Sequence, residues 1–311
     1  MNRTELLDAI DKKYRAMGQD PDVHLSGLLH AEPITYWDYI QVDALLGLQI
    51  KRTQLPDEMV FIMYHQINEL LFKMILWEMG QLPESGSLTA AKFSMHLNRI
   101  SRYFDMLAES FNIMGDGMEP EQYMKFRDTL TPASGFQSAQ FRKIEFASTE
   151  LRNLVDQRFR EQVHPEASME EVFDLLYWQA AGKDHTTGAK NALLRNFEHR
   201  YKAEFLDFMH EYRNKNLWTL FRALPEDVRN DVGLRNAMRH YDHTVNIRWV
   251  MAHYHAAEKY IGGGAATGGS PWQRYMHPRY QKRMFFPGLW TDAEKEQWGI
   301  DNLEGYQKLE S

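Results

Sequence analysis

Residues 57–82 read DEMVFIMYHQINELLFKMILWEMGQL, a stretch in which apolar side chains recur at helical spacing. Pro56 and Asp57 are a typical helix start, and Pro83 is a typical stop. The stretch therefore predicts one long helix from Asp57 to about Leu82. This helix is the first indication of an all-α fold.

Similar signals predict helices along the rest of the chain, and no segment shows sustained period-two alternation rich in Val, Ile and Thr. Thr4 is expected to cap the first helix. The other helices are predicted at residues 4–17, 36–49, 88–111, 121–130, 137–160 and 227–261, with a helical insertion at 168–224 and a break at 115–117. We predict an all-α helical bundle in which residues 1–311 form a single domain.

The composition excludes several classes of protein. The 36 Lys and Arg against 43 Asp and Glu give a net charge of −7, which does not favour nucleic acid or an anionic membrane as a partner. The chain has no cysteine, so disulfides, thiolate metal sites and thiol nucleophiles are excluded. No stretch reaches the ~20 apolar residues of a membrane helix, and the start lacks a signal-peptide core. We expect a cytoplasmic protein.

The 13 histidines direct attention to imidazole chemistry. Di-iron bundles need two Glu-x-x-His motifs on facing helices, but the chain has only one, Glu161 to His164, next to Pro165. His253 is a better candidate, because its face of the predicted helix is mostly apolar and has two alanines on the next turn, while His255 is expected to face water. That face comprises Asn246, Trp249, Val250, Ala256, Ala257 and Tyr260. Either His253 is an ordinary core histidine, or it is the ligand beside a flat haem.

Two further positions combine polar and aromatic side chains. His65 shares a helix face with Phe61, Ile62, Asn68, Glu69 and Phe72. It either forms a self-satisfied pair with Glu69 at i, i+4 or points into an aromatic pocket. Arg127 lies one turn after Tyr123, and its guanidinium group could bind both oxygens of a carboxylate. The alternative for Arg127 is a surface ion pair with Asp128.

In four ordered blocks the chain resembles the tryptophan 2,3-dioxygenase family. The first is the start of the 57–82 helix with His65-Gln66 and Glu69-Leu70, and 36–46 resembles the family's N-terminal motif. The second holds Tyr123 and Phe126-Arg127-Asp128, then Pro132-Ala133-Ser134-Gly135-Phe136-Gln137-Ser138, Gln140, Arg142 and Glu145. The last two are His253 with Ile261-Gly262, and Thr267-Gly268-Gly269-Ser270.

The resemblance implies one b-type haem per chain, ferrous in the active state, with His253 as the proximal iron ligand. Trp249, Ser134 and Gly268 are then expected at the haem, with Ser134 near bound oxygen. It also implies a homotetramer, in which Tyr36, Tyr39 and Ile40 reach a neighbouring subunit's site.

The implied reaction inserts both atoms of O2 across the indole C2–C3 bond of L-tryptophan, giving N-formylkynurenine in tryptophan catabolism. His65 would hydrogen-bond the indole N–H, Arg127 would bind the carboxylate and Thr267 the amino-acid head group. Phe61, Tyr123 and Phe126 would surround the ring.

The chain also departs from the family's usual residues. Tyr64 replaces a smaller or amide side chain, Asn112 replaces a tryptophan, and Ile67, Asn68 and Leu71 follow the distal His-Gln pair. These differences keep a second hypothesis open, a haem mono-oxygenase of the same superfamily acting on tryptophan, a substituted tryptophan or a tyrosine. A third hypothesis is a non-catalytic protein that binds haem or an aromatic ligand.

Overall fold

The computed structural model describes residues 1–84, 88–130, 137–164, 166–184, 187–262 and 272–310. Every regular element in these ranges is a helix, and two isolated bridges are the only strand-like pairings there. The all-α prediction is therefore confirmed. Among the described residues, no helix is both long enough and apolar enough to cross a membrane.

The chain divides into two compact units, residues 1–49 and 50–311. The N-terminal unit contains α1 (Arg3–Ala16), α2 (Pro21–Gly27), α3 (Tyr36–Ile40) and α4 (Val42–Leu46). All of its residues are described, and only Pro21 is buried. This unit therefore has almost no core of its own.

Two predictions for the N-terminal unit are wrong in detail. Asn2, not Thr4, caps α1, because its side chain accepts from the Glu5 N–H while the Glu5 carboxylate accepts from the Asn2 N–H. The helix expected over 36–49 is two short helices, because Gln41 adopts a left-handed conformation with φ of +57° between α3 and α4.

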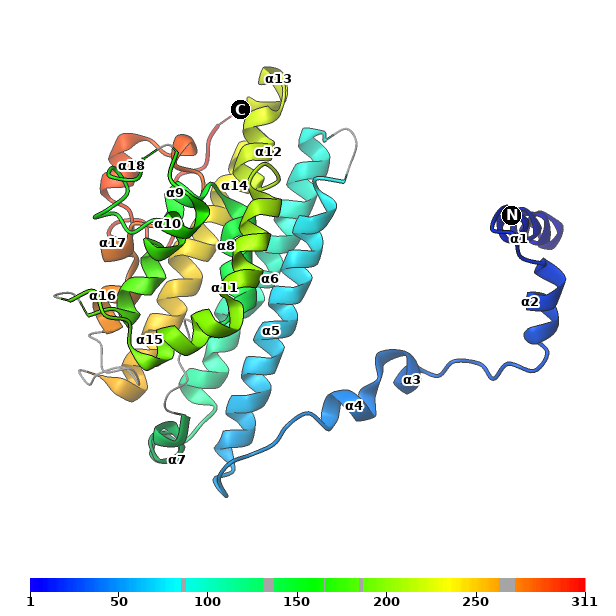
Figure 1. Cartoon of the computed structure of the whole chain (residues 1–311), viewed down its shortest axis with the longest axis horizontal. Coiled ribbons are helices and arrows are strands. Elements are labelled where there is room, and N and C mark those ends of the chain that lie inside the picture. The colour runs from blue at the N-terminus through cyan, green and yellow to red at the C-terminus, as the bar shows by residue number, and fades with distance from the viewer. Residues whose placement is uncertain (85–87, 131–136, 165, 185–186, 263–271, 311) are drawn as a thin grey trace. The chain divides into compact units, whose positions relative to one another are not determined.

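The second unit contains the long helices that build the bundle (Figure 1). Its α-helices are α5 (Asp57–Gln81), α6 (Ala90–Asp116), α7 (Pro120–Arg127), α8 (Ala139–Ser148), α9 (Leu151–Leu154), α10 (Met169–Asp174), α11 (Ala192–Tyr212), α12 (Leu217–Ala223), α13 (Glu226–Arg229), α14 (Val232–His243), α15 (Trp249–Ile261), α16 (Trp272–Met276), α17 (Pro278–Gln281) and α18 (Asp292–Glu296). Short 3-10 turns are η1 (Asp128–Leu130), η3 (Tyr177–Gly182) and η5 (Pro287–Leu289).

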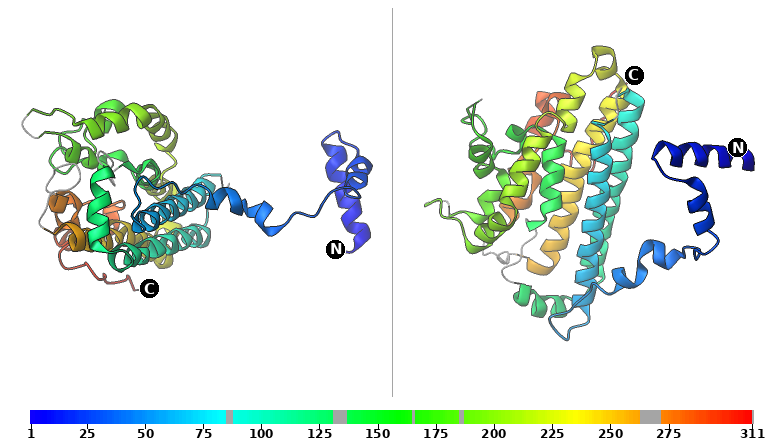
Figure 2. Two further views of the ribbon diagram at one scale, coloured as in Figure 1. Left: turned by 90° about the horizontal axis from the view of Figure 1, so that it is seen from below. Right: turned by 45° about the vertical axis from the view of Figure 1, so that its right-hand side comes forward.

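A π-helical segment, η4 (Thr244–Arg248), joins α14 to α15 without a break in the helical path. The composite helix lies beside α6, which also packs against α5, and α8 packs between α5 and α11 (Figures 1 and 2). The main core forms where these helices meet, around the fully buried Ile75, Phe93, Phe104 and Tyr241.

Other predicted boundaries need correction. The helix expected over 137–160 ends at Ser148, because Thr149 is extended and its hydroxyl donates to the Phe285 carbonyl. Only a single turn, α9, follows before residues 155–160, which are not helical. In contrast, α6 runs on through Gly115, where the buried side chain of Met114 offsets the ~1 kcal/mol helix penalty of a glycine.

The predicted insertion at 168–224 is helical and contributes to the same core as the bundle. Phe173, Trp178, Phe197 and Phe205 from this segment are buried in the main cluster. Its helix α11 packs on α8, and its turn η3 contacts α16. The segment therefore forms one wall of the structure around the site described next.

Candidate functional site

A cavity of about 450 Å³ lies within the second unit. Its walls come from α5, α6, α7, η1, α8, η3, η4, α15, α16 and α17, and they are mostly aromatic and aliphatic. A volume of this size and an apolar lining with a few polar groups are typical of a small-molecule or cofactor site.

His253 of α15 lines this cavity together with Trp249, Ala256 and Ala257 of the same helix. Its ring stacks on Phe111 of α6, with centroids 5.0 Å apart and planes 14° apart. Burial, with a smaller contribution from the nearby His65, lowers the pKa of His253 to about 4. The imidazole is therefore neutral at pH 7 and offers a nitrogen lone pair, as an iron ligand must. His255 is exposed, as predicted.

His65 of α5 lines the same cavity. Its Nδ1 lies 2.8 Å from the carbonyl oxygen of Phe61. Because a carbonyl can only accept, Nδ1 carries the proton and Nε2 is left as an acceptor. Burial is the main cause of the lowered pKa of His65, so this neutral tautomer is favoured at pH 7.

The pair proposed between His65 and Glu69 is not formed by a hydrogen bond. The Glu69 carboxylate accepts instead from the Ser138 hydroxyl at 2.7 Å and from the Gln140 amide at 2.8 Å. Ser138 also caps α8 by accepting from the Phe141 N–H. Glu69 thus fixes the start of α8 to α5, and His65 is free to face the cavity.

Arg127 and Tyr123 of α7 both line the cavity, as their one-turn spacing predicted. Burial raises the pKa of Tyr123, although its hydrogen bond with Arg127 acts in the opposite direction. The Tyr123 ring lies 6.1 Å from Phe61 and 4.6 Å from Tyr260. Phe126 is fully buried behind them, 5.5 Å from both Phe61 and Tyr123, and does not line the cavity.

The first turn of α5 holds α7 in place. The Asp57 carboxylate accepts from the Glu119 N–H at 2.6 Å, and the Asp57 N–H donates to the Gln122 side chain at 3.2 Å. Beside Tyr123, the Tyr260 hydroxyl donates to the Met114 carbonyl and ties α15 to α6. These contacts position Tyr123 and Arg127 relative to both histidine-bearing helices.

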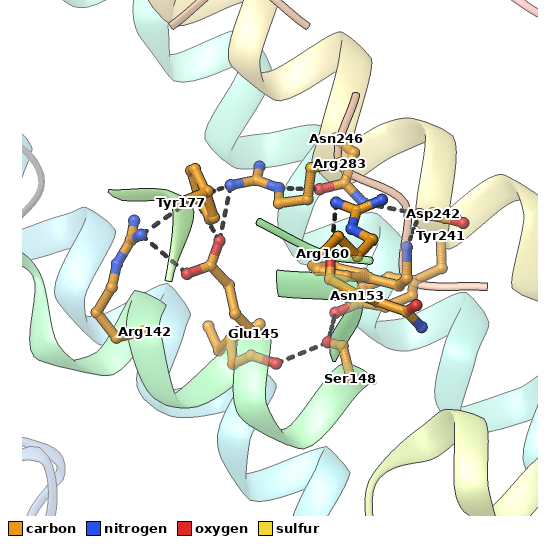
Figure 3. Close-up of polar contacts among 12 residues, drawn as sticks. Arg142, Glu145, Ser148, Asn153, Arg160, Tyr177, Tyr241, Asp242, Asn246 and Arg283 are labelled. Carbon is orange, nitrogen blue, oxygen red and sulfur yellow. Dashed lines mark hydrogen bonds and ion pairs between the residues drawn. The ribbon is translucent and has the colours of Figure 1, made fainter. Parts of the chain in front are cut away.

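Three of the cavity's lining residues, Arg142, Tyr177 and Arg283, form with Glu145 a buried group that we call the inner polar cluster (Figure 3). Glu145 is fully buried between the arginines, with Arg142 Nη1 2.9 Å from its Oε2 and Arg283 Nη1 2.7 Å from its Oε1. The Tyr177 hydroxyl donates to Glu145 Oε1 at 2.6 Å. Arg283 Nε also donates to the Asn246 side-chain oxygen, so η4 is joined to this cluster.

Comparison with known proteins places the chain in a family. A family model described as tryptophan 2,3-dioxygenase matches residues 26–246. The chain belongs to the tryptophan 2,3-dioxygenase family. Tryptophan 2,3-dioxygenases of Bacillus thuringiensis subsp. konkukian and Ruegeria sp. are each 30% identical to it, over 85% and 84% of this chain and 93% and 92% of their own lengths. That of Caulobacter vibrioides is 31% identical over 84% of this chain and 98% of its own length.

Some residues expected from the tryptophan 2,3-dioxygenase family are not placed at the cavity. Ser134, Thr267 and Gly268 lie outside the described residues. Tyr36, Tyr39 and Ile40 belong to the N-terminal unit, where their side chains are exposed. The cavity therefore brings together His253, Trp249, His65, Phe61, Tyr123 and Arg127.

The sequence alone did not predict the inner polar cluster of this family member. Arg142 and Glu145 stand at i, i+3 in a motif, which was a usable signal for an ion pair on one helix face. Tyr177 and Arg283 carried no comparable pattern, because only the folded chain brings them to Glu145. Phe111, which stacks on His253, was missed for the same reason.

Proposed function

We propose that the protein is a haem-dependent tryptophan 2,3-dioxygenase that converts L-tryptophan and O2 into N-formylkynurenine. The main support is the placement of His253, His65 and Arg127 around one cavity in a chain of this family. The haem requires a neutral imidazole as its ligand. The substrate requires a hydrogen-bond acceptor for the indole N–H and a cation for the carboxylate.

The residues at His253 fit a haem. The neutral imidazole provides a ligand atom, Ala256 and Ala257 leave room beside it, and Trp249 provides a flat apolar contact. A ferrous haem held there would supply the metal at which O2 is bound and activated. The surrounding apolar wall excludes water from the reacting groups.

The other lining residues fit an aromatic amino acid. The Arg127 guanidinium binds the substrate carboxylate, and Tyr123 and Phe61 form part of the aromatic wall against the indole ring. The indole N–H donates to Nε2 of His65, which is the acceptor because Nδ1 is bound to the Phe61 carbonyl. These contacts fix the orientation of the indole C2–C3 bond, which is the main contribution of the protein to the rate.

A second candidate function is mono-oxygenation of tryptophan, a substituted tryptophan or a tyrosine. It is favoured by Tyr64, which is buried, lines the cavity and lies 5.2 Å from the His65 ring. This phenol narrows the space beside the histidine at a position where the family usually carries a smaller or amide side chain.

One experiment separates the candidates. The purified protein is reduced without air, then mixed with L-tryptophan and oxygen-18, and the product mass is measured. Formylkynurenine with two labelled atoms supports the dioxygenase, and a hydroxylated or oxindole product with one labelled atom supports the mono-oxygenase. Binding of O2 or CO without conversion of any aromatic amino acid would leave only a binding function.

We also propose that the protein is a homo-oligomer, by family analogy a tetramer. An apolar stripe on α5, formed by Met63, Ile67, Leu70, Met74 and Trp77, is exposed along almost the whole helix. The N-terminal unit exposes Tyr36, Trp37 and Tyr39 in addition. Exposed apolar surface of this extent is typical of an interface, and a second copy of the chain would bury both surfaces. Tyr36, Tyr39 and Ile40 would then reach the site of a neighbour.

A further inference from the structure

The charges around the cavity are strongly asymmetric. Arg127, Arg142 and Arg283 line it, and no aspartate or glutamate does so among the described residues. An apolar cavity with three guanidinium groups is suited to an occupant with more than one negative charge. The proposed function uses Arg127 for the substrate carboxylate, so Arg142 and Arg283 still require an explanation.

These two arginines are almost completely buried, with 5% and 7% of their surfaces exposed. Each uses its Nη1 group for Glu145 and Tyr177. Their Nη2 groups have no hydrogen-bond partner within the described part of the chain, although both side chains line the cavity. Each arginine therefore retains donors for a ligand, and both are rigidly held by the same carboxylate.

The inner polar cluster also carries an excess of positive charge. Two guanidinium groups share the single carboxylate of Glu145, which leaves one positive charge without a partner. The nearest further carboxylate in the network, Asp242, accepts instead from Asn246, Trp290 and the N–H groups of Phe285 and Phe286. A buried cation is costly unless an anion pairs with it, so the cluster favours an anionic group in the cavity.

Through Asn246, the cluster contacts the helical path that carries His253. Asn246, which accepts from Arg283, precedes His253 by seven residues, or about 10 Å of helix. Arg142 follows Phe141, whose ring lies 4.6 Å from Trp249, one turn before His253. Both arginines line the same cavity as His253, so a planar ligand held by His253 could direct its side groups towards them.

We propose that Arg142 and Arg283 bind the propionate carboxylates of the porphyrin, with Glu145 and Tyr177 as positioning residues. This inference rests on the proposed function, because it assumes that a haem binds at His253. Planar guanidinium groups bind carboxylates through paired donors, and the buried setting strengthens the contact.

The test compares two porphyrins that differ only in charge. Full-length protein is titrated with ferric haem and with its dimethyl ester, and the two dissociation constants are read from the Soret band. We expect wild type to bind haem at least ~10-fold more tightly than the ester, the lower limit for a charge-assisted hydrogen bond. In Arg142→Gln and Arg283→Gln, the ratio of the dissociation constant of the ester to that of haem should fall towards one. Partial unfolding would weaken the binding of both porphyrins alike and leave this ratio unchanged.

Arg239→Gln is the matched control. Arg239 is equally buried and pairs with Glu294 at 2.6 Å, but it does not line the cavity, so its variant should retain the wild-type ratio. Arg127→Gln should weaken L-tryptophan binding and leave the porphyrin ratio unchanged. The inference would be overturned if the ratio kept its wild-type value in both Arg142→Gln and Arg283→Gln. It would also be overturned if the ratio fell to one in Arg127→Gln.

The same titration separates this inference from the proposed function. If wild type bound neither porphyrin, the haem assignment and the proposed function would both fail. If it bound haem and the ester equally, only the assignment of Arg142 and Arg283 to the propionates would fail.

Discussion

The imidazole of His253 and the phenyl ring of Phe111 are stacked nearly parallel, 14° apart, across the contact between α15 and α6. The contact fixes the plane of the imidazole, because rotation about its side chain would drive the ring into Phe111. It also removes one ring face from water, which contributes to the lowered pKa of His253. A neutral imidazole held in one orientation suits the iron-ligand role proposed for His253.

Replacing His253 should abolish haem retention. His253→Ala removes the only proposed iron ligand, so the purified variant should lack a Soret band after expression with ample haem. His255→Ala is the control, because His255 is exposed on the same helix and should retain full haem content. A full Soret band in His253→Ala would disprove the ligand assignment.

The haem-free protein should lose stability on acidification through His253. Its pKa is about 4 in the folded chain against about 6.5 when unfolded, so the unfolded chain binds a proton first as the pH falls. This contribution to stability is complete above pH ~6.5 and is lost by pH ~4, a loss of about 3 kcal/mol. Urea unfolding of wild type and His253→Ala should show that the free energy of unfolding falls less on acidification in the variant. Parallel pH profiles would contradict the assignment.

Removing the Arg127 guanidinium should weaken substrate binding. Arg127→Ala should raise the KM for L-tryptophan by roughly 10- to 150-fold, which corresponds to about 1.5–3 kcal/mol for a charge-assisted contact. Arg222→Ala is a suitable control, because Arg222 is exposed and pairs with Glu150 on the surface. Steady-state kinetics on both variants provides the comparison, and equal effects would exclude the carboxylate role.

Neutralising Glu145 should destabilise the fold. Glu145→Gln leaves two buried guanidinium groups without their shared carboxylate, so the free energy of unfolding should fall by about 3–5 kcal/mol. The half-exposed Glu204, paired with Lys143, provides the control, since Glu204→Gln should cost no more than about 1 kcal/mol. Chemical denaturation measures both, and a loss in Glu145→Gln no larger than in the control would contradict the coupled arrangement.

Shared active sites should be detectable by subunit mixing. One variant carries Tyr36→Ala and Tyr39→Ala with an intact cavity, and the other carries His253→Ala with an intact N-terminal unit. If the N-terminal unit completes a neighbour's site, co-expression should give more activity than the sum of the separate variants. Activity equal to that sum, in confirmed mixed oligomers, would show that each chain works alone.

Hydrophobic periodicity, together with residues typical of helix starts and ends, identified the helices that carry the site. Pro56, Asp57 and Pro83 bounded α5 correctly, and the apolar face around His253 faces the cavity as expected. His65 and Arg127 were each predicted with two alternatives, and both residues line the cavity. These successes depend on spacing within one helix, which a sequence displays directly.

The failures depend on contacts between distant segments. Nothing local to Thr149 shows that its hydroxyl binds the Phe285 carbonyl and that α8 ends before it. The pairing of Arg283 with Glu145 spans more than a hundred residues and follows no pattern in either segment. Gln41 adopts a left-handed conformation that its residue type seldom favours, so a single helix was expected across it.

The π-helical segment η4 has a consequence for how insertions and deletions act on this protein. A π turn holds one residue more than an α turn but completes about the same rotation, so η4 absorbs one residue between α14 and α15. Deleting one residue from η4 should therefore give a regular α turn and leave α15 in nearly the same orientation. Deleting one residue between Trp249 and His253, within regular α winding, should instead turn the rest of the helix by about 100° and move His253 out of the cavity. Equal loss of haem binding in the two deletions, with helical circular dichroism retained in both, would contradict this role of the π turn.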